Sequence, residues 1–171
     1  MMLRPAKPTD SQAVLALNRA FVHFLSPLTR ERLVMLERQA RLHIVVEEHD
    51  AVVAFLLAFR EGADYDSVNY RWFAERYDRF LYVDRAVVSG SHQGTGVGQA
   101  FYRHVFEHAR QTRVPVVVCE YDVEPPNPAS ERFHARLGFH EVGRQTITSP
   151  AGRKTVSMQL ASVSGWHDRE A

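Results

Sequence analysis

Three glycines stand at alternate positions, Gly94, Gly96 and Gly98, just before a stretch with helical spacing. The backbone N–H groups in the first turn of a helix have no partner within the helix, and the peptide dipoles place partial positive charge there. Such a helix start binds anions, with phosphate as the usual ligand, and glycine removes side chains that would keep a phosphate away. The stretch from Ser89 to Gly98 therefore predicts a phosphate-binding loop. A glycine-rich turn without a ligand is the alternative.

Two common phosphate-binding loops do not fit this stretch. A P-loop ends in Gly-Lys-Ser/Thr, and the stretch has no lysine. A dinucleotide fingerprint requires a glycine three positions after Gly96, where Gln99 stands, although Glu120 lies about where the ribose-binding acid of that fingerprint would be. The fingerprint also follows the first strand of its fold, whereas several helices and strands are expected before Gly94.

Two motifs resemble those of a known superfamily. The segment Gln93–Gly98, QGTGVG, matches the Gln/Arg-x-x-Gly-x-Gly/Ala signature of the GNAT superfamily of acyl-CoA-dependent N-acetyltransferases. Downstream, Asn127–Phe139, NPASERFHARLGF, resembles the second coenzyme A motif of this superfamily, an asparagine followed by a short helix that ends in Leu-Gly-Phe. One helix and one strand are expected between the motifs, as in the superfamily, and the resemblance covers about residues 3 to 161.

The resemblance implies an α/β (α+β) fold with a central mixed, mostly antiparallel sheet of about seven strands, helices on both faces, and strands four and five splayed apart. It also implies acetyl-CoA as the acyl donor. The pantetheine arm would lie between the splayed strands, and the pyrophosphate would lie on backbone amides of the glycine loop. The residues expected to bind the coenzyme are Ala86, Val87, Val88, Gln93, Gly94, Thr95, Gly96, Val97, Gly98, Gln99, Asn127, Ser130 and Phe133.

Acetyl transfer to an amine needs a base, because a free alkylamine resembles lysine, with a pKa of about 10.4, and only the neutral amine attacks. In the resembling superfamily the base is usually a carboxylate on strand four or five, where Asp84 and Glu120 lie here. The alternative is that both carboxylates form salt bridges or face water. Successive residues of a strand point to opposite faces, so we expect no pair between Asp84 and Arg85. The resemblance implies a backbone N–H near Val87 as the donor to the negative oxygen of the intermediate.

The departing thiolate must be protonated or hydrogen-bonded, and many superfamily members carry a tyrosine in the final helix for this step. His134 stands in that place here. Because histidine titrates at about 6.5, His134 could donate as an imidazolium or as a neutral N–H, and it could also bind the coenzyme or only pack. The catalytic residues expected are thus Glu120, His134 and Asp84.

Acceptor contacts are expected from Phe24, in the connection between the first two helices, and from Tyr82. The segment 61–80 is unusually aromatic and acidic, so it could form a pocket in which carboxylates and ring faces attract a cationic amine. The residues for such a pocket are Asp64, Tyr65, Asp66, Tyr70 and Trp72. A short amphipathic helix that covers the sheet is the alternative. The residues for this helix are Phe73, Tyr77 and Phe80.

Periodicity and turn signals predict the elements that carry these residues. Their order is roughly β-α-α-β-β-β-α-β-α-β-β, a mixed sheet with helices on its faces. Thr29 is expected to cap the second helix, and Glu48–Asp50 to form a hairpin turn. The helices are expected over 9–21, 26–40, from the glycine loop to about 112, and 127–138. The strands are expected over 3–7, 42–50, 51–61, 80–89, 114–122, 139–148 and 153–162.

Length, charge and residue composition limit the other kinds of protein that this chain could be. The 171 residues suit one domain over 1–163, followed by a tail over 164–171. A net charge of +1 gives no bulk attraction to nucleic acid, and no apolar run approaches the roughly 20 residues of a membrane helix. The single cysteine, Cys119, favours a cytoplasmic protein. His104 and His108 are four apart on a helix but have no third ligand at a defined spacing, so we expect no metal.

The sequence thus predicts an N-acetyltransferase that moves an acetyl group from acetyl-CoA to a primary amine of a small molecule or peptide, by direct attack in a ternary complex. A non-catalytic acyl-CoA-binding or sensing module on the same fold is the alternative. The amine acceptor is the expected partner, without nucleic acid or membrane, and pairing of sheet edges into a homodimer is left open.

Overall fold

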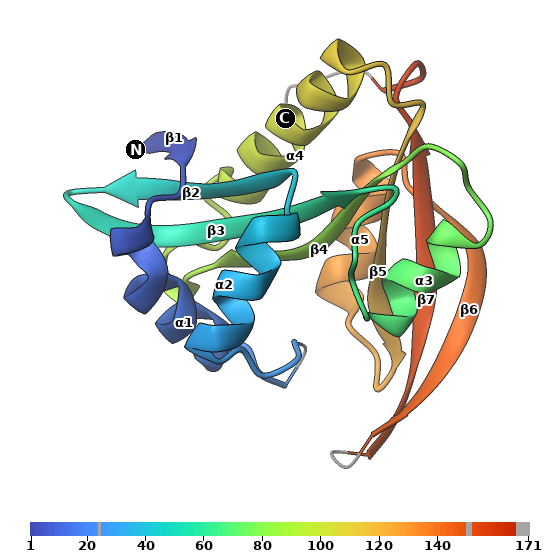
Figure 1. The fold of residues 1–171 in the computed structure, drawn as a ribbon, viewed down its shortest axis with the longest axis horizontal. Helices are drawn as coiled ribbons and strands as arrows, with labels where there is room; N and C mark the ends of the chain where they lie inside the picture. The colour runs from blue at the N-terminus through green and yellow to red at the C-terminus, as the bar shows by residue number, and fades with distance from the viewer. Residues whose placement is uncertain (24, 150–151, 167–171) are drawn as a thin grey trace. The chain divides into compact units, whose positions relative to one another are not determined.

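The computed structural model describes residues 1–23, 25–149 and 152–166 (Figure 1). These residues form two compact units, each built from two separate segments of the chain. Unit 1 comprises Met1–Tyr65 and Val83–His104, and unit 2 comprises Asp66–Tyr82 and the chain from Val105 onward. The expectation of one domain over 1–163 stays a prediction.

Unit 1 holds one half of the sheet. Its strands are β1 (Met2–Pro5), β2 (Leu42–Glu48), β3 (Ala51–Arg60) and β4 (Leu81–Val88) from Val83 on, in that order. The pairs β1–β2 and β2–β3 are antiparallel. The β2–β3 turn is confirmed, because His49 and Asp50 both have positive φ, 49° and 61°, as a tight two-residue hairpin turn requires.

Two helices of unit 1 cover the strands. α1 (Ser11–Ala20) packs on β3, and α2 (Arg30–Gln39) packs beside α1; both lie in front of β3 in Figure 1. Thr29 is confirmed as the cap of α2, because its hydroxyl accepts a hydrogen bond from the backbone N–H of Arg32 at 3.1 Å. Each helix buries apolar residues on one side, which marks the face that turns inward. These residues are Val14 on α1 and Leu33 and Leu36 on α2.

Unit 2 holds the other half of the sheet. The start of β4 pairs in parallel with β5 (Val116–Glu124), through Leu81–Val117 and Tyr82–Val118. β5 then pairs antiparallel with β7 (Gly152–Ser162), which pairs antiparallel with β6 (His140–Ser149). The seven strands run in the order β1-β2-β3-β4-β5-β7-β6. The predicted mixed, mostly antiparallel seven-stranded sheet is therefore confirmed, and the splaying of β4 and β5 stays a prediction.

The segment before β4 forms the short helix α3 (Val68–Ala74). A short helix is present, but only Phe73 of the predicted stripe lies in it, because α3 ends at Ala74 and Tyr77 and Phe80 follow it. Phe73 and Phe80 are both fully buried. α3 lies close to β6, because a Cβ added to Gly143 would meet the Trp72 ring at 2.5 Å. Glycine at this position is therefore what lets the indole approach the strand.

The long helix α4 (Val97–Gln111) and α5 (Pro128–Arg136) complete the helices. The start of the predicted tail packs on unit 2. Trp166 is 8% exposed and stacks on Phe106 with ring centroids 4.6 Å apart. Its indole removes a large apolar surface from water, which anchors the chain after β7. Residues 167–171 of the tail lie outside the described residues.

Candidate functional site

The predicted phosphate-binding loop lies in unit 1, between β4 and α4. Gly94 and Gly96 have φ of +78° and +89°, a conformation that L side chains rarely adopt. A Cβ added at either glycine would meet no atom within 4 Å, and both residues are exposed. α4 begins at Val97, directly after this open stretch. The first-turn N–H groups of a 15-residue helix thus lie beside bare, accessible backbone, which is the arrangement that suits an anion.

The loop is fastened to the strands of unit 1 at its start. The Ser89 backbone N–H donates to the carbonyl of Val53 on β3 at 2.9 Å. The His92 ring bridges two groups, with Nε2 2.8 Å from the Glu48 carboxylate on β2 and Nδ1 2.7 Å from the Ser89 hydroxyl. The hydrogen bond from His92 lowers the pKa of Glu48. The Thr95 hydroxyl donates to the His92 carbonyl at 2.7 Å, so the glycines are held between fixed neighbours.

The coenzyme-binding residues expected on β4 run directly into this loop. Ala86 is exposed, Val87 is buried and Val88 is intermediate, at the end of the strand. The Gln93 side chain donates to the Val88 carbonyl at 3.4 Å. The ten coenzyme-binding residues expected over 86–88 and 93–99 therefore all lie in unit 1, at the end of β4 and in the loop and first turn that lead into α4.

The expectation that Asp84 and Arg85 do not pair is wrong. The Arg85 Nε–H donates to Asp84 Oδ2 at 2.6 Å, and the two side chains are 6% and 5% exposed. Alternation fixes where each side chain leaves the backbone, but the Arg85 chain is long enough to turn its guanidinium back to its neighbour. Tyr65 donates its hydroxyl to the second oxygen, Asp84 Oδ1, at 2.5 Å. Both oxygens of Asp84 are thus occupied, as in the salt-bridge alternative.

The ion pair belongs to a buried polar network within unit 1. Arg85 Nη1 donates to the Asn18 side-chain oxygen on α1 at 2.8 Å. The Asn18 side-chain amide donates in turn to the Ser26 carbonyl at 3.1 Å. Burial raises the pKa of Tyr65, and the adjacent Asp84 raises it further, so the phenol keeps its proton. The network ties β4 to the connection between α1 and α2.

Glu120, the other predicted base, lies on β5 in unit 2 and is held by two donors. The Tyr82 hydroxyl donates to Glu120 Oε1 at 2.9 Å, and the Asn69 side-chain amide donates to the same oxygen at 2.8 Å. The Gln145 side chain donates to the Asn69 carbonyl oxygen at 2.9 Å, which fixes the orientation of the Asn69 amide. Side chains from α3, β4, β5 and β6 thus converge on one carboxylate oxygen.

Sequence reasoning did not identify Asn69 or Gln145. They are 76 residues apart, and no spacing rule relates a position on α3 to one on β6. Tyr82 was expected to contact the acceptor, which stays a prediction. It is fully buried, and its hydroxyl donates to Glu120.

His134 lies on α5 and is 7% exposed. Its Nδ1 is 2.8 Å from the backbone carbonyl of Ser130, which can only accept, so Nδ1 carries the proton of the neutral ring. Burial lowers the pKa of His134 to about 4. The ring also stacks on Tyr121, with centroids 5.7 Å apart. Around neutral pH His134 is therefore a buried, neutral imidazole whose Nδ1 proton is directed to the Ser130 carbonyl, which favours packing over proton donation.

This burial predicts acid sensitivity of unit 2. Because the pKa of His134 is about 4 in the folded protein and 6.5 ordinarily, the unfolded chain binds more protons between these values, and stability falls as the pH falls through this window. The loss attributable to His134 between pH 7 and pH 5 is about 2 kcal/mol. Urea unfolding at both pH values should show a smaller loss in His134→Gln than in the parent. The exposed His140 serves as control, and an equal change in His140→Gln would contradict the assignment.

The remaining expected coenzyme residues surround the start of α5. Asn127 caps the helix, because its side-chain oxygen accepts from the Ser130 backbone N–H at 3.2 Å. The Ser130 hydroxyl is 3.2 Å from His134 Nδ1, and the Phe133 ring lies edge-on to His134. These contacts account for the local structure of the second motif, and a role in coenzyme binding stays a prediction.

The residues expected around the acceptor belong to both units. Phe24 lies outside the described residues. Asp64 and Tyr65 belong to unit 1, whereas Asp66, Tyr70 and Trp72 belong to unit 2. Tyr70 is 2% exposed and packs edge-on against Tyr82, so it is part of an aromatic core. The Arg76 guanidinium lies 4.1 Å from the centre of the Trp72 ring.

In the part of the chain that the structure describes, no three or more His, Cys, Asp or Glu side chains are grouped to hold a metal ion. Over the same residues, no helix combines the length and the apolar character needed to cross a membrane.

A family model described as "Acetyltransferase (GNAT) family" matches residues 12–139. No curated protein matches the sequence. Among solved structures, the chain is similar to the ribosomal-protein-S18-alanine N-acetyltransferase from Escherichia coli, with a TM-score of 0.70 and 14% identity over 99% of this chain and 98% of that one. It is also similar to the ribosomal-protein-alanine N-acetyltransferase from Brucella melitensis, with a TM-score of 0.71 and 20% identity over 95% and 99%.

A further similar structure is Ard1 from Thermoplasma volcanium, with a TM-score of 0.76 and 15% identity over 94% of this chain and 96% of that one. At these identities the three structures show a shared fold. The order and direction of the strands described above agree with it.

Proposed function

Since the chain belongs to the GNAT acetyltransferase family, we propose that it transfers an acetyl group from acetyl-CoA to a primary amine of a small molecule or peptide. The observation that carries this proposal is the open loop at the start of α4, with Gly94 and Gly96 at positive φ. The amides from Gln93 to Gln99 bind the pyrophosphate of acetyl-CoA, and the backbone of Ala86–Val88 binds its pantetheine arm. The expected cytoplasmic location stays part of the proposal.

Glu120 is the general base of this proposal. The Tyr82 and Asn69 donors stabilise its carboxylate form and fix its orientation. Glu120 takes the proton of the acceptor ammonium, directly or through water. The amine nitrogen then forms a bond to the acetyl carbon. The carbon–sulfur bond breaks, and the nitrogen loses its second proton to solvent to give the amide. The backbone N–H near Val87 stabilises the negative oxygen formed on the way.

Two of the three expected catalytic side chains have less support. Asp84 is engaged by Arg85 and Tyr65 through both of its oxygens. His134 is neutral near pH 7 and its proton points to the Ser130 carbonyl. We therefore assign the proton of the departing thiolate to solvent.

A non-catalytic acyl-CoA-binding module is the second candidate, and the neutral, packed His134 is the observation that favours it. The two candidates are separated by measuring release of free thiol from acetyl-CoA with a panel of primary amines. Release that depends on an amine supports the enzyme. Binding of acetyl-CoA without release for any amine in the panel would establish the module instead.

The donors on Glu120 predict a shift in the pH–rate profile. Tyr82→Phe removes one hydrogen bond that favours the charged carboxylate but keeps the ring beside Tyr70 and Phe73. A hydrogen bond to a charged group contributes about 1.5 kcal/mol or more, which corresponds to about one pH unit. We expect the acidic limb of kcat/KM to move upward in pH by about that amount. An unmoved limb with normal coenzyme affinity would show that Tyr82 does not tune the base.

A further inference from the structure

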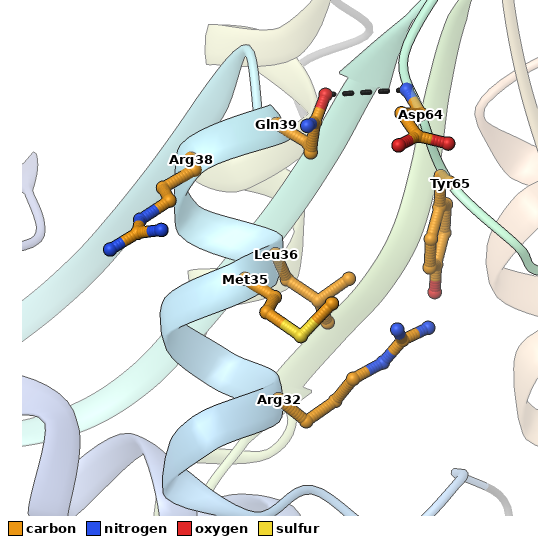
Figure 2. Close-up of a pocket in the computed structure, with 7 residues that line it drawn as sticks. All are labelled: Arg32, Met35, Leu36, Arg38, Gln39, Asp64 and Tyr65. Carbon is orange, nitrogen blue, oxygen red and sulfur yellow. Dashed lines mark hydrogen bonds between the residues drawn. The ribbon is translucent and has the colours of Figure 1, made fainter.

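A pocket of about 180 Å³ lies in unit 1 between α2 and the segment that follows β3. Figure 2 shows side chains of both elements turned toward the same space, with the Arg32 guanidinium near the end of the Tyr65 ring. Arg38, also on α2, lines the pocket too, but its guanidinium points away from Tyr65. The other residues that line the pocket are Arg32, Met35, Leu36, Gln39, Asp64 and Tyr65.

One wall of the pocket is rigid. The Tyr65 ring stacks on Phe59 of β3, with centroids 4.5 Å apart and planes at 22°. Its hydroxyl is fixed on Asp84, and the Arg32 Cζ lies 5.6 Å from its ring centre. Asp84 precedes Ala86 by two residues, about 7 Å along β4. A ligand against Tyr65 therefore lies close to the strand segment proposed to bind the pantetheine arm.

The opposite wall combines apolar and charged groups. Leu36 is buried, whereas Met35 is 56% exposed on a helix whose other apolar side chains mostly face inward. Gln39 accepts a hydrogen bond from the Asp64 backbone N–H at 3.2 Å, which joins the two elements at one end of the pocket (Figure 2). The pocket thus offers an apolar surface, one guanidinium that faces it and one exposed carboxylate.

We propose that this pocket binds the acceptor, and that the acceptor is a free amino acid with an apolar side chain. The inference rests on the function proposed above. Arg32 binds the carboxylate of the acceptor, because a guanidinium matches a carboxylate with two parallel hydrogen bonds. Met35 and Leu36 contact its apolar side chain. The amine then lies on the side of Tyr65 and β4.

Size and charge select this class over others. The pocket is smaller than the about 300 to 1,000 Å³ of pockets that enclose a drug-sized ligand, so it suits a small molecule. Asp64 repels a second negative charge, which disfavours dicarboxylates and phosphate esters. A peptide carries an amide where a free amino acid carries the carboxylate, so it leaves Arg32 without this partner.

The test compares leucine with leucinamide, in which an amide replaces the carboxylate, and expresses kcat/KM per neutral amine because the amide also makes the α-amine less basic. We expect kcat/KM to favour leucine by about tenfold, the effect of roughly 1.4 kcal/mol from a charged hydrogen-bonded pair. Arg32→Gln should remove this preference while leaving coenzyme affinity unchanged. Arg38→Gln makes the same charge change on the same helix, and it should keep the preference.

A direct binding measurement separates failure of this inference from failure of the proposed function. Leucine at millimolar concentration should shift the NMR signals of the Arg32 side chain and the Tyr65 ring, whether or not acetyl-CoA turns over. Leucine binding that requires Arg32, without turnover of any amine, would support the pocket and contradict the enzyme. Amine-dependent turnover with equal rates for leucine and leucinamide, or no leucine binding at all, would overturn the pocket assignment.

Discussion

Replacing Gly96 by glutamate is expected to abolish binding of acetyl-CoA. The residue has φ of +89°, a conformation that costs an L residue about 1 to 2 kcal/mol. A side chain would also enter the open space beside the start of α4, and its negative charge would oppose the diphosphate. We expect the dissociation constant to rise by at least about a hundredfold, equivalent to about 3 kcal/mol, in isothermal titration calorimetry.

Gly90→Glu is the matched control for this prediction. Gly90 belongs to the same loop and has the same open surroundings, but it does not have a positive φ. Gly90→Glu adds the same charge, but it does so without a positive φ and farther from the start of α4. It should therefore weaken binding far less. If both variants lost the same affinity for acetyl-CoA, a negative charge anywhere near the loop would be enough to weaken binding. Unchanged affinity in Gly96→Glu would show that the phosphate site lies elsewhere.

Replacing Glu120 by glutamine is expected to lower kcat by about 10²- to 10⁴-fold, the usual contribution of a general base. Glutamine keeps the size of the side chain, and its oxygen can still accept from Tyr82 and Asn69. Folding and coenzyme affinity should therefore be close to normal. The acidic limb of the pH–rate profile should disappear, because no carboxylate remains to be protonated.

Asp84→Asn tests the alternative base by the same chemical change. We expect its acidic limb to remain, and its main effect to be on stability, because Arg85 would be left buried without its partner. Breaking a buried ion pair costs about 3 to 5 kcal/mol. A pH–rate profile that loses its acidic limb in Asp84→Asn and keeps it in Glu120→Gln would exchange the roles of the two carboxylates.

The elements with strong local signals were predictable from sequence. Thr29 was identified as a helix cap, and the turn at His49 and Asp50 as a hairpin, because their conformations depend on neighbours within a few residues. The glycines of the loop were predictable for the same reason. Gly94 and Gly96 have the left-handed backbone that glycine permits, directly before the start of α4.

Contacts between distant segments were not predictable from local rules. The pair of Asp84 and Arg85 was missed because alternation describes the direction of the Cβ atom and not the reach of a long side chain. The donors to Glu120 come from α3 and β4, so they require the tertiary fold. The anchoring of Trp166 on Phe106 has no periodic signal either, because a single aromatic residue after the last strand sets no pattern.

Titration with coenzyme A, followed by calorimetry and by amide hydrogen exchange, tests the central claim most directly. We expect a clear binding heat and slower exchange of the amides from Gln93 to Gln99, with unchanged exchange in the hairpin turn at His49 and Asp50. Absence of heat together with unchanged exchange in the loop would contradict the proposed coenzyme site, and the proposed activity with it.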